Sequence, residues 1–258
     1  IILAGISFIG DRSTPVGEHQ EVIWETGSVV AQQERDKPNI VLIVADDLGW
    51  NDLTFNGGGV AQGTVPTPSI DSIAHSGINF TNGYAGQGTC APSRAMIMTG
   101  RYGSRFGFEF TPTPAGMPMV IGMMSTDSNK PPSIQNKNAR AVPYDEMGLP
   151  ASEVTIAEEL KDQGYYTAHI GKWHLGRKLG SAPQDQGFDQ SLLMHSGLHA
   201  AEDDPDVVNS KLSYDPIDRF LWAGMKYAAS YNGGAAFEPG GYLTDYYTNE
   251  AGKGIESN

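Results

Sequence analysis

The sequence predicts an α/β fold. Along residues 39 to 170, short apolar runs rich in β-branched residues alternate with amphipathic stretches that carry helix-starting and helix-ending residues. Strands that alternate with helices in this way are typical of a layered α/β protein. The 258 residues are 39% hydrophobic and 18% charged, so the chain is long and apolar enough to build a substantial core.

Charge and composition exclude several classes of partner. The chain has 17 basic and 30 acidic residues, a net charge of −13, which repels phosphate backbones and anionic membrane surfaces. We therefore expect no nucleic acid partner. No apolar run approaches the roughly 20 residues that a membrane-spanning helix needs. The single cysteine, Cys90, cannot form an internal disulfide and is either an inert buried thiol or a reactive group.

Residues 1–37 are predicted to be an N-terminal extension that the fold does not require. The apolar run Ile1–Ile9 is similar to the core of a secretion signal without its basic lead-in, and the alternative is a loosely packed terminus. Residues 10–37 are polar and show no clear period. We therefore expect the folded domain to occupy residues 38–258 and the protein to be periplasmic or secreted.

The first predicted strand is Ile40–Ala45, an unbroken apolar run typical of a parallel strand buried on both faces. Asp46 and Asp47 follow it directly. Ligands of open α/β sheets bind beyond the carboxyl ends of strands, so these two acids are placed to hold a cation or to activate a group. The alternative is that Asp46 caps a turn and Asp47 is solvated.

A short helix is predicted next, over the residues from Thr67 to Gly77. It begins at the threonine cap with a proline in its first position, and it ends at the glycine. Ile78–Phe80 and Tyr84–Ala85 then indicate a second strand, which leads the chain to Cys90.

A further helix is predicted to start at Cys90 and to end at Thr99–Gly100, because Pro92 suits a first turn and Arg94–Met98 continues it. At a helix start, unpaired backbone N–H groups and the helix dipole stabilise negative charge. A nucleophile or an anionic substrate at position 90 would gain this support, which makes the reactive interpretation of the cysteine as good as the inert one.

The third pattern is an amphipathic helix over Thr155–Gly164 followed by a strand over Tyr165–Ile170. The strand leads into Gly171–Gly176. If that segment is extended, Lys172 and His174 project to the same side and offer a cation and a titratable imidazole to one ligand. The alternative is a surface lysine and a core histidine.

Together these patterns resemble one family, the type I, cysteine-type sulfatases of the alkaline phosphatase superfamily. Cys90–Arg94 followed by Thr99–Arg101 looks like the core motif of that family. Pro38–Gly49 upstream, Gly171–Gly176 downstream and, more weakly, Gly187–Asp189 match in the family's order. The resemblance implies an alkaline-phosphatase-like fold, a large mixed sheet with helices on both faces, of which this chain carries the N-terminal portion.

The resemblance also implies a hydrolase of sulfate esters, an arylsulfatase-like enzyme. In that family a formylglycine-generating enzyme oxidises the cysteine to formylglycine, whose aldehyde hydrates to a geminal diol. One hydroxyl of residue 90 would attack sulfur and expel the alcohol, and the second would collapse to the aldehyde and release sulfate. Serine or unmodified cysteine lacks the second hydroxyl, so this route requires the modification. The substrate implied is a sulfated small molecule or a sulfated polysaccharide.

Metal binding is likewise implied by the resemblance. Asp46 and Asp47 match the family's ligands for a divalent cation, which modified Cys90 would share. Carboxylate oxygens suit hard cations, and we expect Ca²⁺, with Mg²⁺ as the alternative. The cation would favour ionisation of the attacking hydroxyl and neutralise sulfate oxygens.

Three further residues match catalytic positions of the family. Arg94 would hold the diol and the ligand oxygens through its guanidinium fork. Lys172 would bind a sulfate oxygen. His174 would hydrogen-bond the diol or take up a proton when sulfate leaves.

One departure from the family concerns length. Family members are longer, and their later half carries further metal ligands and a second His and Lys around the sulfate, none of which can be matched here. The chain ends within a stretch, Leu243–Ala251, that resembles a helix upstream of those residues. We interpret the sequence as an N-terminal fragment that holds half a metal site, and we expect it to be inactive in isolation.

Some segments and functions stay open. Gly107–Pro150 is predicted to be a long loop or lid. His195 and His199, four residues apart, suggest zinc, but no complete ligand set is evident. Two other functions are a phosphate-ester or phosphonate hydrolase of the same superfamily, and a catalytically silent, sulfatase-like binding protein whose Cys90 is never modified.

Overall fold

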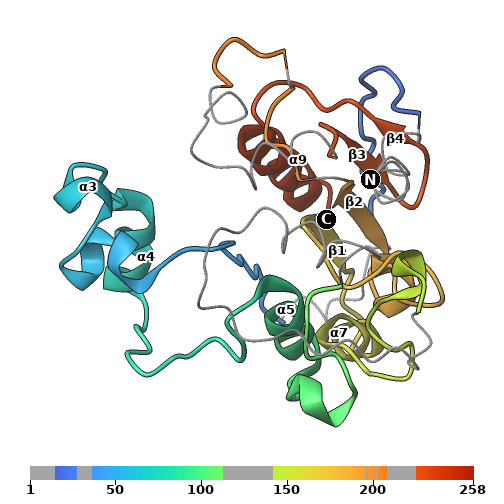
Figure 1. Ribbon diagram of the computed structural model, residues 1–258, viewed down its shortest axis with the longest axis horizontal. Coiled ribbons are helices and arrows are strands. Elements are labelled where there is room, and N and C mark those ends of the chain that lie inside the picture. The colour runs from blue at the N-terminus through green and yellow to red at the C-terminus, as the bar shows by residue number, and fades with distance from the viewer. Residues whose placement is uncertain (1–14, 28–36, 113–141, 196, 202, 208–224) are drawn as a thin grey trace, which may run out of the picture.

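The computed structural model describes residues 15–27, 37–112, 142–195, 197–201, 203–207 and 225–258. Within this part of the chain the strands form one mixed sheet in the order β1-β2-β3-β4 (Figure 1). Its members are β1 (Ala168–Gly171), β2 (Gln190–Met194), β3 (Ala229–Tyr231) and β4 (Ala236–Phe237). The β1–β2 pair is parallel and the other two pairs are antiparallel. The predicted α/β class with a mixed sheet is confirmed.

The α-helices of the described chain are α3 (Val60–Gly63), α4 (Pro68–Ser76), α5 (Cys90–Thr99), α7 (Ile156–Asp162) and α9 (Leu243–Glu256). Single turns of 3₁₀ helix are η2 (Trp50–Asp52), η3 (Thr54–Asn56), η4 (Gly103–Arg105), η5 (Tyr144–Glu146) and η6 (Pro183–Gln186). None of the described helices is both long and apolar enough to cross a membrane. The helices predicted after Thr67, at Cys90 and after Thr155 are confirmed as α4, α5 and α7.

The start of α7 shows why local sequence was enough to predict it. The Thr155 hydroxyl accepts a hydrogen bond from the Glu158 N–H at 3.2 Å, and the Glu158 carboxylate accepts one from the Thr155 N–H at 2.7 Å. This reciprocal pair is a capping box, and it satisfies two backbone donors that a helix start leaves unpaired. All of its atoms come from four consecutive residues.

Helices cover both faces of the sheet, as expected. Neighbouring residues of a strand point to opposite faces, and β2 shows this directly. Leu192 packs in a core with residues of α9, including Leu243. Leu193 packs against the other core, which contains Ala91 and Ala95 of α5. The sheet therefore separates two apolar layers, with α9 on one face and α5 on the other (Figure 1).

Two predicted strands are absent from the described structure. Ile40–Ala45 forms no strand, and its side chains are exposed to solvent instead of being buried between helices. Residues 78–80 and 84–85 likewise form no strand, and Ile78, Phe80 and Tyr84 are exposed. A strand requires a hydrogen-bonded neighbour, which the described chain does not supply to either segment.

The N-terminal segment takes a larger part in the fold than its sequence indicates. The N–H of Gly17 donates to Ala236 O at 2.9 Å, and Val22 and Trp24 are buried in the core beside α9. The indole N–H of Trp24 donates to the Glu250 carboxylate at 3.0 Å. This packing runs against the expectation that the whole of residues 1–37 is dispensable. The division at residue 38 stays a prediction, and the signal-like Ile1–Ile9 lies outside the described residues.

Replacing Trp24 with alanine is expected to destabilise the protein by about 3–5 kcal/mol, because it empties a large core site and leaves Oε2 of Glu250 without the indole donor. The neighbouring Ile23, 77% exposed, is a matched control whose alanine variant should change stability by less than about 0.5 kcal/mol. Urea unfolding followed by circular dichroism measures both. Equal midpoints for the two variants would show that the segment is dispensable after all.

Candidate active site

Three segments that are far apart in the sequence meet beyond the carboxyl end of β1. The Arg94 guanidinium of α5 donates through Nη2 to Asp46 Oδ1 at 3.2 Å. Lys172 Nζ lies 2.5 Å from Asp46 Oδ2. Arg94 also donates through Nη1 to the backbone carbonyl of Lys172 at 2.6 Å. We call Asp46, Arg94 and Lys172 the charged cluster. It unites residues from three of the predicted motifs.

Helix α5 positions both Cys90 and Arg94. Cys90 is its first residue and is half-buried, and Arg94 stands four positions later on the same side of the helix. An adjacent side of the helix carries Ala91 and Ala95, both fully buried against the core. The small alanines let the helix lie close to the body of the protein, which directs Arg94 toward the end of β1.

The far end of α5 is held in place by local geometry and by an ion pair. Gly100 takes a left-handed conformation, φ 65°, and its N–H donates to Met96 O at 2.9 Å. Arg101 then forms an ion pair with the Glu153 carboxylate. The Thr99–Arg101 part of the predicted core motif therefore ends and anchors the helix, and it lies outside the charged cluster.

Lys172 and His174 reach the site by a turn, which differs from the extended segment considered above. β1 ends at Gly171, whose φ is 100°, and His174 adopts φ 63°. A left-handed conformation at a residue other than glycine costs about 1–3 kcal/mol and is concentrated at functional sites. Asp47, with φ 55°, is a second such residue here. The alternation argument for a shared side therefore does not apply.

His174 is held in its neutral form. Burial lowers its pKa to about 4, and the positive charges of Lys172 and Arg94 act in the same direction. Nδ1 of His174 is buried and has no hydrogen-bond partner among the described residues. A buried polar atom without a partner is costly, so this ring is ready to bind a further group.

Asp46 is held in its ionised form. Partial burial would raise its pKa, but hydrogen bonds and charge from Lys172 and then Arg94 outweigh burial and lower the pKa below its ordinary value of 3.8. The carboxylate is 39% exposed and the Arg94 side chain 14%. The charged cluster thus contains one anion and two cations, a surplus of positive charge suited to an anionic ligand.

In metal-free protein, the His174 imidazole is expected to titrate near pH 4, and Lys172→Met should raise that pKa because it removes a neighbouring positive charge. Lys178→Met is the matched control, since Lys178 pairs with Asp145 instead. An unfolded chain protonates histidine near pH 6.5, so the stability that neutral His174 provides should decline as pH falls from 6.5 toward 4. NMR titration of the ring nitrogens measures the pKa, and a midpoint near 6.5 would contradict this assignment.

The predicted metal ligands fit a hard cation in kind but not in number. Asp46 offers oxygen donors, and Asp47 lies exposed beside it. Ca²⁺ takes six to eight oxygen ligands. Among the described residues no group of three or more His, Cys, Asp or Glu side chains gathers around one point. Both oxygens of Asp46 instead bind the two cations of the charged cluster. Further ligands would have to come from water or from outside the described residues.

The zinc alternative gains no support in the described residues. The ring Nδ1 of His195 lies 2.8 Å from Arg177 Nη1. The ring of His199 packs near that of Tyr242, with the centroids 6.5 Å apart. The two histidines therefore serve different contacts, and no cluster of metal ligands includes either of them in this part of the chain.

Sequence reasoning missed a histidine that supports the site. His169, on β1, packs edge-on against Trp173 and Phe188, with ring centroids 5.3 and 5.5 Å away. Burial lowers its pKa to about 4. Its Nδ1 lies 3.1 Å from the Ser191 hydroxyl of β2. The only signal was its strand position just before the Gly171–Gly176 motif, which cannot reveal contacts across strands.

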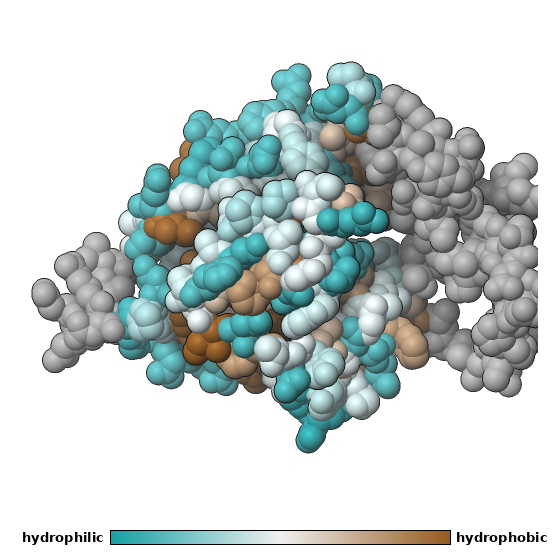
Figure 2. Space-filling view, turned by 90° about the vertical axis from the view of Figure 1, so that its left-hand side faces the viewer, coloured by the Kyte–Doolittle hydropathy of each residue, from teal (hydrophilic) through white to brown (hydrophobic). Residues whose placement is uncertain are grey.

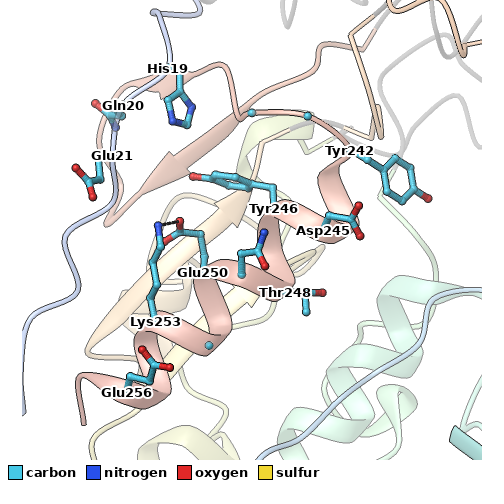
Figure 3. Close-up of a pocket in the computed structure, with 14 residues that line it drawn as sticks. His19, Gln20, Glu21, Tyr242, Asp245, Tyr246, Thr248, Glu250, Lys253 and Glu256 are labelled. Carbon is cyan, nitrogen blue, oxygen red and sulfur yellow. Dashed lines mark hydrogen bonds and ion pairs between the residues drawn. The ribbon is translucent and has the colours of Figure 1, made fainter. Parts of the chain in front are cut away.

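A separate hollow of about 790 Å³ lies over α9 (Figure 3), and none of its lining residues belongs to the charged cluster. Its lining includes Glu21, Asp245 and Glu256, and its lysine, Lys253, is paired with Glu250 at 2.7 Å. The excess of carboxylates repels a sulfate or phosphate group. The charged cluster is therefore a better candidate than this hollow for binding an anionic group.

The fold and the site together define an α/β protein with a positively charged cluster beyond a parallel strand and a cysteine at the start of the adjoining helix. The chain belongs to the sulfatase family, because the family model described as Sulfatase matches residues 38–256.

Individual relatives agree with this assignment. The chain is 38% identical over 159 residues to an arylsulfatase of Hemicentrotus pulcherrimus, a match that covers 59% of this chain and 23% of the relative. It is 37% identical over 164 residues to mouse arylsulfatase G, covering 63% and 25%. The crystal structure of Ps i-CgsB matches with a TM-score of 0.59 and 29% identity, covering 86% of this chain and 42% of that one.

The chain therefore spans about a quarter of the length of these two curated relatives and under half of the solved structure. These matches also support the predicted sulfatase-type, alkaline-phosphatase-like fold. The Asp46, Asp47, Cys90, Arg94, Lys172 and His174 roles remain predictions at this point.

Proposed function

We propose that this protein hydrolyses sulfate esters, in conjunction with the part of the sulfatase fold that its 258 residues do not span. One observation carries the proposal. Arg94, one turn along the helix that Cys90 begins, contacts Asp46 and the Lys172 carbonyl. Three motifs shared with sulfatases thus converge on one point, where an anionic group attached to a substrate would meet both the cations and residue 90.

The nucleophile proposed is residue 90 after oxidation to formylglycine, which supplies a geminal diol. The first turn of α5 contributes its unpaired N–H groups and helix dipole, which stabilise negative charge on the attacking oxygen. The half-buried position of Cys90 keeps this atom accessible to an ester that approaches from solvent. Attack on sulfur expels the alcohol, and the second hydroxyl then releases sulfate.

The charged cluster would orient the sulfate group. Lys172 Nζ acts as a mobile point charge on a sulfate oxygen, whereas the Arg94 guanidinium is fixed by its contact with the Lys172 carbonyl. Fixed donors stabilise the charge that develops in the transition state without having to reorganise. The neutral imidazole of His174 can accept a proton from the diol, because its pKa of about 4 keeps a lone pair available at neutral pH.

Asp46 and Asp47 would hold a divalent cation, for which Ca²⁺ is proposed and Mg²⁺ is the alternative. Such a cation supplies Lewis acidity to the attacking and sulfate oxygens. In this arrangement Asp46 would turn its oxygens from Lys172 toward the cation. Lys172 would then be released to bind sulfate, which gives the ion pair between them a role in the resting protein.

The substrate class proposed is a sulfated saccharide. Ps i-CgsB has been solved in complex with k-i-k-neocarrahexaose, at 29% identity and a TM-score of 0.59. The half-open setting of the charged cluster admits a large alcohol group better than an enclosed pocket would. A formylglycine-generating enzyme is the proposed partner in maturation, and export to the periplasm or the medium is the proposed location.

The test is to produce the complete natural protein together with a formylglycine-generating enzyme and to analyse the peptide that contains residue 90 by mass spectrometry. A mass about 18 Da below that of cysteine shows the aldehyde. Hydrolysis of 4-nitrophenyl sulfate should then exceed that of 4-nitrophenyl phosphate. The reverse preference would favour a phosphate-ester or phosphonate hydrolase, and an unmodified thiol without turnover would favour a silent binding protein.

A further inference from the structure

A further cation lies at the same edge of the sheet as the charged cluster. Arg177 belongs to the segment that follows β1, five positions after Lys172, and its side chain is exposed. Its guanidinium contacts His195, the residue directly after β2. β1 and β2 are parallel neighbours, with Gly171 opposite Leu193. Arg177 therefore joins the carboxyl ends of two adjacent strands, the edge at which open α/β sheets bind their ligands.

Two contacts fix the Arg177 guanidinium in place. Its Nη1 lies 2.8 Å from Nδ1 of His195, and its Nη2 donates to the backbone carbonyl of the same residue. The N–H of His195 in turn donates to Ala228 O at 3.0 Å, which ties this residue to the start of β3. A guanidinium placed by two directed hydrogen bonds is held in one orientation, and its planar fork matches the oxygens of an oxyanion such as sulfate.

The same contact determines which ring nitrogen of His195 carries the hydrogen. A guanidinium has only N–H donors, so Nδ1 of His195 must accept the hydrogen bond from Arg177. Nε2 then carries the ring hydrogen and acts as a donor. Both side chains of this pair therefore offer N–H donors, which suits an anionic ligand and not a cation.

The Arg177–His195 pair is close to the charged cluster. Lys172 and His195 each directly follow one of two adjacent strands, whose backbones are about 5 Å apart. The charge of Arg177 also reaches His174, where it lowers the pKa together with burial, Lys172 and Arg94. Two anionic groups of one saccharide can therefore be bound at this edge, one at the charged cluster and one at Arg177.

The other described surfaces are poorer places for a second anion. The hollow over α9 is lined by several carboxylates (Figure 3). Figure 2 views the side of the molecule that carries α3 and α4, where hydrophilic and hydrophobic residues are mixed. Residues 38–93, which include both of these helices, contain no lysine or arginine. Lys178, next to Arg177, forms an ion pair with Asp145.

We propose that Arg177, held by His195, recognises a second sulfate group on the saccharide whose reactive sulfate lies at the charged cluster. This inference rests on the proposed function and narrows its substrate class to saccharides with at least two sulfate groups. Arg177 would not touch the ester that is cleaved, so it is a specificity residue and not a catalytic one. Because it binds substrate and transition state alike, its contribution is expected in KM.

The kinetic test uses the complete natural protein after conversion of Cys90 to formylglycine. The substrates are two neocarrabioses that share one sulfate, only one of which carries a second. The ratio of kcat/KM for the disulfated over the monosulfated saccharide should be about 10–100, as expected for hydrogen bonds to a charged group. In Arg177→Ala this ratio should fall to about one, through KM. Arg177→Lys should keep part of the preference, because it retains the charge without the fork.

Lys178→Ala is the matched control, because it removes the adjacent exposed cation, whose partner is Asp145. It should keep the preference of the parent protein. An equal loss on both saccharides in Arg177→Ala, with the ratio retained, would show that Arg177 only holds the segment after β1 in place. An equal fall of the ratio in Lys178→Ala would show a general effect of net charge. Either result would overturn the inference.

A binding measurement separates failure of this inference from failure of the proposed function. Cys90→Ala protein cannot turn over, so isothermal titration calorimetry can compare the two saccharides directly. The disulfated one should bind at least about tenfold more tightly, and Arg177→Ala in the same background should remove the difference. This difference without any turnover in the matured protein would support the Arg177 site and contradict sulfate ester hydrolysis. Turnover of 4-nitrophenyl sulfate with equal binding of both saccharides would do the reverse.

Discussion

Cys90→Ser is expected to lower kcat for sulfate ester hydrolysis by about 10⁴-fold or more in the complete protein. Serine can attack sulfur once, but it has no second hydroxyl to expel the sulfate, so a covalent sulfate ester accumulates. A burst of one equivalent of alcohol, followed by almost no turnover, is the expected time course with 4-nitrophenyl sulfate. Mass spectrometry should find about 80 Da added to residue 90, the mass of SO₃.

Cys90→Ala provides the control, because it removes the nucleophile and should give neither burst nor added mass. Melting temperatures within a few degrees of the parent would show that both variants are folded, since a half-buried side chain at a helix start contributes modestly to stability. Turnover by Cys90→Ser within tenfold of the parent would place the nucleophile elsewhere.

Arg94→Ala is expected to lower kcat/KM by about 10²–10³-fold, as the loss of a fixed donor to developing charge does in other enzymes. It removes the contacts that join Asp46 to the Lys172 carbonyl. Arg94→Lys keeps the charge but cannot reproduce two parallel donors, so an intermediate loss is expected. Initial rates on 4-nitrophenyl sulfate measure both variants.

Arg105→Ala is the matched control for these variants, because Arg105 is also an arginine but is exposed at the end of η4. Its kcat/KM should stay within about twofold of the parent. Full recovery of activity in Arg94→Lys would show that the positive charge alone matters and that the two separate hydrogen bonds of the guanidinium group are not needed. Unchanged activity in Arg94→Ala would remove Arg94 from the site.

Local signals explain why the helices could be predicted. The Thr155 and Glu158 side chains that start α7, and the Gly100 that ends α5, act within one turn of their own helix. Such interactions depend on neighbouring residues alone. The convergence of Asp46, Arg94 and Lys172 was anticipated only through family resemblance, because no spacing in the chain reveals that residues 46, 94 and 172 lie side by side.

Contacts between distant residues account for the features that the sequence did not reveal. Trp24 packs in the core beside α9 and donates its indole N–H to Glu250, 226 positions later, and the polar sequence around Trp24 gives no sign of these partners. His174 was considered as part of an extended segment, but a left-handed turn after β1 directs its ring into the protein. Local propensity does not encode either outcome.

The sequence by itself determined the α/β class, the start of α5 at Cys90, the capped start of α7 and the family. These follow from side chains that act on their own backbone and from motifs read in order. Tertiary structure alone decided that Lys172 and Arg94 both form ion pairs with Asp46, that burial keeps His174 neutral, and that Ile40–Ala45 forms no strand in the described structure. The physical reason is that an ion pair, a buried side chain and a strand ladder each require a partner from a distant part of the sequence. Only folding brings that partner into contact.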